Sequence, residues 1–138
     1  MTKALNGGCL CGAVRIEVSG EPYRVGLCHC LDCRKKTGSL FSAFAIWPAA
    51  AVRMTGDVLP QEVRGDYLRH VCRACGSALY EQRRGDDEAE VFLGILDDPS
   101  LLAPTYELWT VRREAWLPPF DLARHYERDR EGEGRTEP

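Results

Sequence analysis

The sequence predicts a mostly β, single-domain fold stabilised by zinc. Three observations support this prediction: short strand-like segments dominate the chain, turn signals separate them, and seven cysteines fall into three tight clusters. A length of 138 residues fits one domain that can form a core, to which metal sites would add stability. The 44% hydrophobic and 28% charged residues are ordinary proportions for a globular protein.

The predicted strands rest on alternation and on apolar runs. Residues 13–18 alternate apolar and polar side chains with a period of two, which is typical of a half-buried strand. Residues 40–47 are rich in aromatic and apolar side chains and are expected in the core. The other predicted strands are residues 23–27, 61–64, 67–71, 78–81, 90–96 and 105–111.

Glycine, proline and aspartate mark the turns between these segments. The turn signals are Gly20-Glu21-Pro22, Gly56-Asp57, Gly85-Asp86-Asp87 and Asp97-Asp98-Pro99. One helical turn is expected after Cys30 and another through residues 99–102. We assign residues 1–126 to one zinc-binding domain. Residues 127–138 are charged and nearly free of apolar side chains, and we expect them to form a disordered tail.

Charge and hydropathy exclude several classes of protein. The net charge of −3 argues against a general nucleic-acid binder. Residues 1–8 lack the apolar core of a signal peptide, and the most apolar stretch, 41–52, is broken by Pro48 and too short to span a bilayer. Clustered thiols without a secretion signal favour the reducing cytoplasm, where they remain available to metal. We therefore expect a cytoplasmic protein with no nucleic-acid or membrane partner.

The cysteine clusters are Cys9-x-Cys11, Cys28-x-Cys30-x-x-Cys33 and Cys72-x-x-Cys75. Thiols one or two residues apart can converge on one ion, whereas disulfide partners are seldom that close. A glycine follows the last cysteine of the first and third clusters, and a sharp turn there would use its freedom to adopt positive φ. These two clusters therefore predict one closed, structural zinc site made of Cys9, Cys11, Cys72 and Cys75.

The middle cluster offers only three thiols. Catalytic zinc typically keeps one position free, so Cys28, Cys30 and Cys33 are the predicted catalytic and metal-binding residues of a second site. Arg34, Lys35 and Lys36 follow, and their positive charge would attract an anionic ligand. Zinc held by thiolates activates water weakly but holds a further thiol well. This ligand set therefore predicts sulfur chemistry, with the thiol of the substrate as the fourth ligand.

Other arrangements of the same residues remain open. A zinc ribbon of Cys30, Cys33, Cys72 and Cys75 would leave Cys9, Cys11 and Cys28 for a second site, with His29 as a further ligand. His29 would otherwise act as an acid or base, or point away from the metal. Disulfides and an iron–sulfur cluster are disfavoured by the spacing. His70 and His125 are isolated, and Trp109 and Trp116 are expected in the core or in a pocket wall.

With these motifs the chain resembles the glutathione-dependent formaldehyde-activating enzyme family, which includes the centromere protein V group. The resemblance extends from about Asn6 to Leu117. The matching stretches are residues 7–15 (GGCLCGAVR), 28–35 (CHCLDCRK) and 72–77 (CRACGS), followed by residues 93–99 and the Trp109 to Leu117 segment.

The resemblance implies a compact fold of several small curled antiparallel sheets around zinc. It implies a structural zinc on Cys9, Cys11, Cys72 and Cys75 and a more labile zinc on Cys28, Cys30 and Cys33. The reaction of the family joins glutathione and formaldehyde into S-hydroxymethylglutathione, and Arg34, Lys35 or Lys36 would pair with glutathione carboxylates. Glu107 stands where the family often has a histidine. A carboxylate that faced the pocket there would disfavour an anionic peptide.

We therefore expect a zinc-dependent carbon–sulfur lyase-type enzyme that acts on a small thiol adduct, with glutathione as the thiol of the family type. A zinc-stabilised binding module and a thiol or zinc sensor without catalysis are the alternatives. The count of three ligands favours the enzyme or the sensor over the binding module. The sequence sets no oligomeric state, although an exposed strand edge would support a homodimer.

Overall fold

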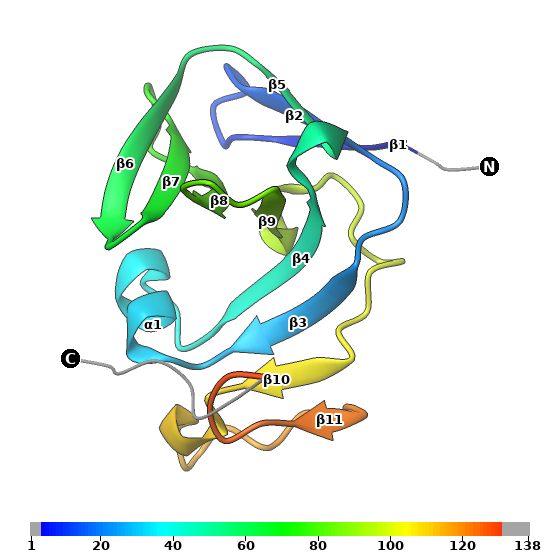
Figure 1. Cartoon of the computed structure of the whole chain (residues 1–138), viewed down its shortest axis with the longest axis vertical. Coiled ribbons are helices and arrows are strands. Elements are labelled where there is room, and N and C mark those ends of the chain that lie inside the picture. Colours follow the sequence, from blue (N-terminus) through cyan, green and yellow to red (C-terminus); the bar gives the residue numbers. More distant parts are fainter. Residues whose placement is uncertain (1–3, 131–138) are drawn as a thin grey trace. The chain divides into compact units, whose positions relative to one another are not determined.

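The computed structural model describes residues 4–130, and its contacts group them into two compact units. The first unit contains residues 4–24 and 44–102, and the second contains residues 25–43 and 103–130. Each unit is therefore built from two segments that are far apart in the sequence. In Figure 1 the colours of the second unit run from blue and cyan in its first segment to yellow and red in its second.

A small antiparallel sheet in the first unit has the strand order β1 (Ala4–Gly8), β2 (Arg15–Ser19), β5 (Val52–Thr55). Ile16 and Val18 are buried, whereas Arg15 and Glu17 are exposed. This alternation is the one predicted from residues 13–18, and it turns one face of β2 toward the core.

The other strands of the first unit pair antiparallel in the order β4 (Ser42–Pro48), β9 (Glu88–Phe92), β8 (Ala78–Arg83), β7 (Tyr67–Cys72), β6 (Val58–Arg64). Figure 1 shows the arrows of β6 and β7 side by side in green. The core prediction for residues 40–47 is confirmed for β4, where Ala45 and Trp47 are fully buried. Two single 3-10 turns, η1 (Ala49–Ala51) and η2 (Leu93–Ile95), follow β4 and β9.

The second unit contains three short parallel strands and one helix. The strand β10 (Tyr106–Leu108) lies between β3 (Arg24–Cys28) and β11 (Arg124–His125) and pairs in parallel with both. Its register places Glu107 beside Leu27 on one side and beside His125 on the other. The helix α1 (Leu31–Thr37) follows β3, and the 3-10 turn η3 (Thr110–Arg112) follows β10.

The mostly β fold and the helical turn after Cys30 are confirmed. Two predicted strands are too long: residues 90–96 leave strand geometry after Phe92, and residues 105–111 after Leu108. The second strand ends because Trp109 has a φ of 58°, a left-handed conformation that no strand accommodates. The pairings of β10 with β3 and with β11 are parallel, which differs from the antiparallel pairing expected. Residues 99–102 form one turn, in which the N–H of Leu102 donates to the carbonyl of Pro99 (2.9 Å).

The charged tail predicted for residues 127–138 lies mostly outside the described residues. Of its first residues, Arg128 accepts the backbone N–H of Trp109 (3.1 Å), and Asp129 accepts the indole N–H of the same residue (2.8 Å). Between residues 4 and 130 no helix has the length and hydropathy needed to cross a bilayer.

Candidate metal centres

The first centre is a group of four cysteines in the first unit. The sulfur atoms of Cys9, Cys11, Cys72 and Cys75 all lie within 4.8 Å of one another. The Sγ of Cys11 lies 3.6 Å from that of Cys9 and 3.8 Å from that of Cys72. One pair follows β1, and the other closes β7 before β8 begins. The fold therefore brings together thiols that lie 61 residues apart in the sequence and follow strands of two different sheets.

Tight turns aim these thiols inward, as the glycines predicted. Gly12 has a φ of 84° and Gly76 a φ of 78°. The N–H of Gly12 donates to the carbonyl of Cys9 (3.2 Å), and that of Gly76 donates to the carbonyl of Cys72 (2.9 Å). The backbone N–H of Cys75 also points at the Sγ of Cys72 (3.5 Å). Such N–H groups stabilise a thiolate, so each turn is shaped to present ionised sulfur to a cation.

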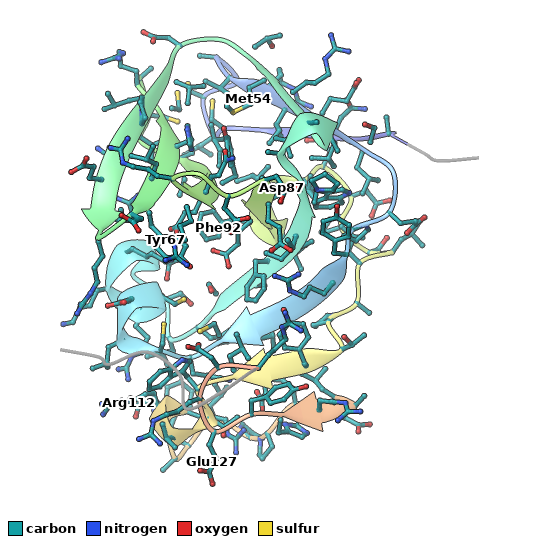
Figure 2. The ribbon with its side chains drawn as sticks, in the orientation of Figure 1. Met54, Tyr67, Asp87, Phe92, Arg112 and Glu127 are labelled. Carbon is teal, nitrogen blue, oxygen red and sulfur yellow. The ribbon has the colours of Figure 1, made fainter. Side chains whose placement is uncertain are left out.

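Two cysteines of this centre are buried and two are exposed. Cys9 and Cys72 pack with Val14 and Leu79 in an apolar cluster, which Met54 covers in part. Figure 2 labels Met54, which lies in β5. One cysteine of each pair is therefore fixed by packing in the core. The other cysteine, Cys11 or Cys75, lies at the surface and supplies the remaining sulfur atom.

Hydrogen bonds shift the pKa values of the thiols in the first centre to different degrees. Hydrogen bonds from the side chain and backbone of Ser77 lower the pKa of Cys75 to about 5. The backbone N–H of Val14 lowers the pKa of Cys9. A backbone hydrogen bond from Ala13 lowers the pKa of Cys11, but the thiol of Cys9 and burial outweigh it and raise the value to about 11.

The second centre is a group of three cysteines in the second unit. The sulfur atoms of Cys28, Cys30 and Cys33 lie within 4.8 Å of one another, and all three residues are buried. Cys28 ends β3, Cys30 caps α1, and Cys33 lies in the first turn of that helix. The N–H of Cys33 donates to the Sγ of Cys30 (3.3 Å), which fixes the direction of the capping thiol.

These three thiols cannot all ionise without a compensating cation. Hydrogen bonds with Cys30 and Cys33, together with burial, raise the pKa of Cys28. A hydrogen bond with Cys28 lowers the pKa of Cys33, but contact with Cys30 and burial outweigh it and raise the value to about 12. A divalent cation would remove this mutual repulsion. Both cysteine groups have the donor type and the spacing of sulfur atoms that zinc requires, and all seven cysteines are free thiols.

The structure separates the three predicted cations of α1. Arg34 pairs with the carboxylate of Glu114 (3.0 Å), so its charge is partly compensated. The charge of Lys36 contributes to lowering the pKa of Cys33, although other effects outweigh it. Lys35 is exposed. Of the three, Lys36 is the cation whose charge acts on a thiol of the second centre.

Beside the second centre lies a polar network that no sequence motif indicated. Glu107 is fully buried, and its carboxylate meets three side chains: His29 at 2.8 Å, His125 at 2.7 Å and Arg113 at 2.6 Å. Burial raises the pKa of Glu107, but hydrogen bonds from His29 and His125 and the charges of His29 and Arg113 outweigh it and lower the value. Glu107 therefore presents no uncompensated charge that would repel an anionic substrate.

The structure also shows where the other candidate residues of the sequence lie. The four-cysteine group has the predicted composition and replaces the zinc-ribbon alternative, and His29 is not a member of either group of sulfur ligands. Trp109 is buried, whereas Trp116 is 70% exposed and is not in the core. His70 stacks on Tyr80, with ring centroids 4.1 Å apart. Figure 2 shows Arg112 and Glu127, both exposed, directed away from the ribbon.

The comparison with known families agrees with this pattern of cysteines. Residues 4–112 match the family described as "Glutathione-dependent formaldehyde-activating enzyme", and this range contains all seven cysteines. The chain belongs to this family. The formaldehyde-activating family match ends before Arg113 and His125, so two partners of Glu107 lie beyond it.

Curated relatives resemble part of the chain. A putative glutathione-dependent formaldehyde-activating enzyme of Halomonas elongata is 34% identical over 93 residues, which cover 55% of this chain and 54% of the relative. An uncharacterized lyase of Schizosaccharomyces pombe is 31% identical over 74 residues, or 54% of each chain. The chain therefore spans about half the length of these curated relatives.

A solved structure shares the fold. The crystal structure of a Rhodobacter sphaeroides protein aligns with a TM-score of 0.55 and 27% sequence identity. The alignment covers 67% of this chain and 88% of the other. The fold is therefore shared with a solved protein over most of that protein's length.

Proposed function

We propose that the chain is a zinc-dependent carbon–sulfur lyase-type enzyme that acts on a small thiol adduct. Membership of the formaldehyde-activating enzyme family and the names of its relatives support a lyase-type activity. The observation that carries the proposal is the convergence of three buried thiols, from Cys28, Cys30 and Cys33, to which residues 4–130 add no fourth ligand. S-hydroxymethylglutathione is the adduct that the family suggests.

The two centres would have different roles, one structural and one catalytic. Four thiols around one zinc fill its coordination sphere, so Cys9, Cys11, Cys72 and Cys75 would have a structural role. Three thiols leave one position for an exogenous ligand, which is the arrangement of catalytic zinc sites. Zinc in the second centre would supply a Lewis acid that keeps the substrate sulfur in its thiolate form.

The remaining chemistry belongs to the chain and the substrates. In the family's reaction a carbon–sulfur bond forms between the thiol and the carbonyl carbon of formaldehyde, and the proton of the thiol ends on the oxygen as a hydroxyl group. Cys28, Cys30 and Cys33 would hold the zinc to which the substrate sulfur binds, and their burial would limit the access of bulk water to it. Lys36, near Cys33, and the exposed Lys35 would bind the carboxylates of a peptide such as glutathione. We also propose a cytoplasmic location, because a reducing compartment keeps seven free thiols available to metal.

The exchange rate at equilibrium tests this proposal, because formaldehyde also adds to glutathione without a catalyst. Exchange NMR measures the interconversion of free formaldehyde and S-hydroxymethylglutathione with and without the zinc-loaded protein. We expect the wild-type protein and the exposed-site control Ser100→Ala to accelerate the exchange, and Cys30→Ser to leave it at the uncatalysed rate. A wild-type protein that gives no acceleration with glutathione or other small thiols would contradict the proposal and favour a sensor or a binding module.

A further inference from the structure

Glu107 is a buried carboxylate whose position is determined by three partners. Its exposed fraction is 0%, and a carboxylate is buried at this depth only when charges and hydrogen bonds compensate it. Oε2 meets Nε2 of His29, whereas Oε1 is shared by Nη1 of Arg113 and Nδ1 of His125. Arg113 follows η3 and His125 lies in β11, so the second segment of this unit holds one carboxylate oxygen and leaves the other for His29.

This arrangement fixes the ring of His29. An ionised carboxylate only accepts hydrogen bonds, so Nε2 of His29 carries the proton and donates it to Glu107. Nδ1 is buried and has no hydrogen-bond partner among the described residues. The rings of Phe41 and Phe120 lie next to the imidazole, with centroids at 5.7 and 6.5 Å. The hydrogen bond to Glu107 is thus the polar contact that orients the ring.

His29 connects Glu107 to the metal ligands because it lies between Cys28 and Cys30. Its backbone N–H donates to the carbonyl of Leu108 (3.0 Å), the residue after Glu107. Both the backbone and the side chain of His29 are therefore bonded to β10. Because His29 lies between Cys28 at the end of β3 and the extended Cys30, fixing it on β10 restricts the directions that the two flanking thiols can take.

A second contact lies at the C-terminal end of residues 28–33, the segment that contains the three cysteines. Arg34 directly follows Cys33 and pairs with Glu114 (3.0 Å), six residues beyond Leu108. Both partners of this pair are partly exposed, so its contribution is small beside that of a buried hydrogen bond. Of these two side-chain contacts with the segment that holds Cys28, Cys30 and Cys33, the one made by Glu107 is therefore the stronger.

We propose that Glu107 is a positioning residue for the second metal centre: through His29 it holds Cys28 and Cys30 in the orientation that lets them bind one ion with Cys33. The inference rests on the proposed zinc site, although its readout is metal affinity and not turnover. Glu107 is not a member of the group of three metal-binding side chains and acts through His29. Partners bonded directly to a metal ligand typically change metal affinity by about 10- to 100-fold, and we use this range for Glu107, which acts through a residue between two ligands.

The test compares metal binding at the two centres of one molecule. Cobalt(II) replaces zinc and gives sulfur-to-metal charge-transfer and d–d bands that report the number of thiolates and the geometry. Wild type, Glu107→Gln, Glu107→Ala and His29→Gln are titrated with cobalt(II) in competition with a chelator. The control is Glu81→Gln, which neutralises a carboxylate that is just as buried but lies in the first unit. Near-UV circular dichroism, which includes the signal of the buried Trp109, reports whether the second unit stays folded.

We expect Glu107→Ala to weaken binding at the second centre by about 10- to 100-fold and to shift its d–d bands, with the first centre unchanged. Glu107→Gln retains an acceptor for His29 and should be weakened less, whereas Glu81→Gln should match wild type. The double variant Glu107→Ala with His29→Gln should lose no more affinity than one of the single variants. Folded Glu107→Ala protein with unchanged affinity and bands at the second centre would overturn the positioning role. A wild-type protein that binds one metal only would overturn the second site itself, and with it this inference.

Discussion

The Oγ of Ser77 lies 3.1 Å from the Sγ of Cys75 and accepts a hydrogen bond from the backbone N–H of Leu10 at 3.0 Å. Leu10 separates Cys9 from Cys11, so one hydroxyl group connects the two cysteine turns of the first centre. A thiolate only accepts hydrogen bonds, so the hydroxyl of Ser77 donates its proton to Cys75 when that thiol is ionised.

We expect Ser77→Ala to weaken zinc binding at the first centre by about 10-fold, because the thiolate loses a donor and the two turns lose their link. Competition with a chromophoric chelator measures the affinity. Ser100→Ala is the matched control, since Ser100 is exposed and bonds to Asp98 in its own turn. Equal zinc affinity in Ser77→Ala and wild type would show that Ser77 has no part in the centre.

Replacement of Gly76 by alanine isolates the effect of backbone conformation. No atom lies within 4 Å of the Cβ that alanine would add, but the φ of 78° is unfavourable for any L side chain. We expect Gly76→Ala to lower the free energy of unfolding by about 1–2 kcal/mol in a urea titration of the zinc-loaded protein. Gly94→Ala adds a methyl group in equally open space without a positive φ, and should change stability little. Equal losses in both variants would argue against strain at Gly76.

The lowered pKa of Glu107 predicts a pH-dependent contribution to stability. A carboxylate with a lowered pKa in the folded state stabilises the fold above its ordinary value of 4.5, and this contribution is lost as pH falls through the lowered pKa. The stability difference between wild type and Glu107→Gln should therefore be largest near neutral pH and shrink in acid. Urea unfolding of both proteins in chelator, which removes the pH dependence of metal binding, measures this difference. A difference that grows as the pH falls would have the wrong sign.

Trp109 adopts its left-handed conformation because it is hydrogen-bonded to residues 128–129, which lie outside the strand. Its backbone N–H donates to the carbonyl of Arg128, and its indole N–H donates to Asp129. We expect Asp129→Ala to destabilise the protein by about 1–2 kcal/mol, since a buried indole N–H loses a charged acceptor. Asp129→Asn keeps an acceptor oxygen and should recover most of this loss. If the alanine and asparagine variants unfold at the same urea concentration, the hydrogen bond contributes nothing measurable.

The turns that carry the cysteines of the first centre could be predicted because they depend on local chemistry. Short spacings and the glycines after Cys11 and Cys75 specify turns whose geometry is nearly independent of the rest of the fold. The alternation in residues 13–18 predicted β2 for the same reason, since a half-buried strand shows its period directly in the sequence.

The network around Glu107 could not be predicted because it depends on tertiary contacts. Glu107 lies 78 residues from His29 and 18 from His125 in the sequence. Neither histidine lies in a sequence motif that indicates Glu107 as its partner. Only the parallel pairing of β10 with both neighbours brings these side chains together. The early end of the predicted strand at residues 105–111 has a similar origin, because contacts with Arg128 and Asp129 set the backbone of Trp109.

The most direct test of the central claim measures the zinc content of wild type and Cys30→Ser, each with and without glutathione. X-ray absorption on the same samples measures the number of sulfur ligands on zinc. The account predicts two zinc ions in wild type, one in Cys30→Ser, and a further sulfur ligand in wild type alone when glutathione is added. Two zinc ions in both proteins, or zinc coordination in wild type that does not respond to glutathione or another small thiol, would contradict a thiol-binding site on Cys28, Cys30 and Cys33.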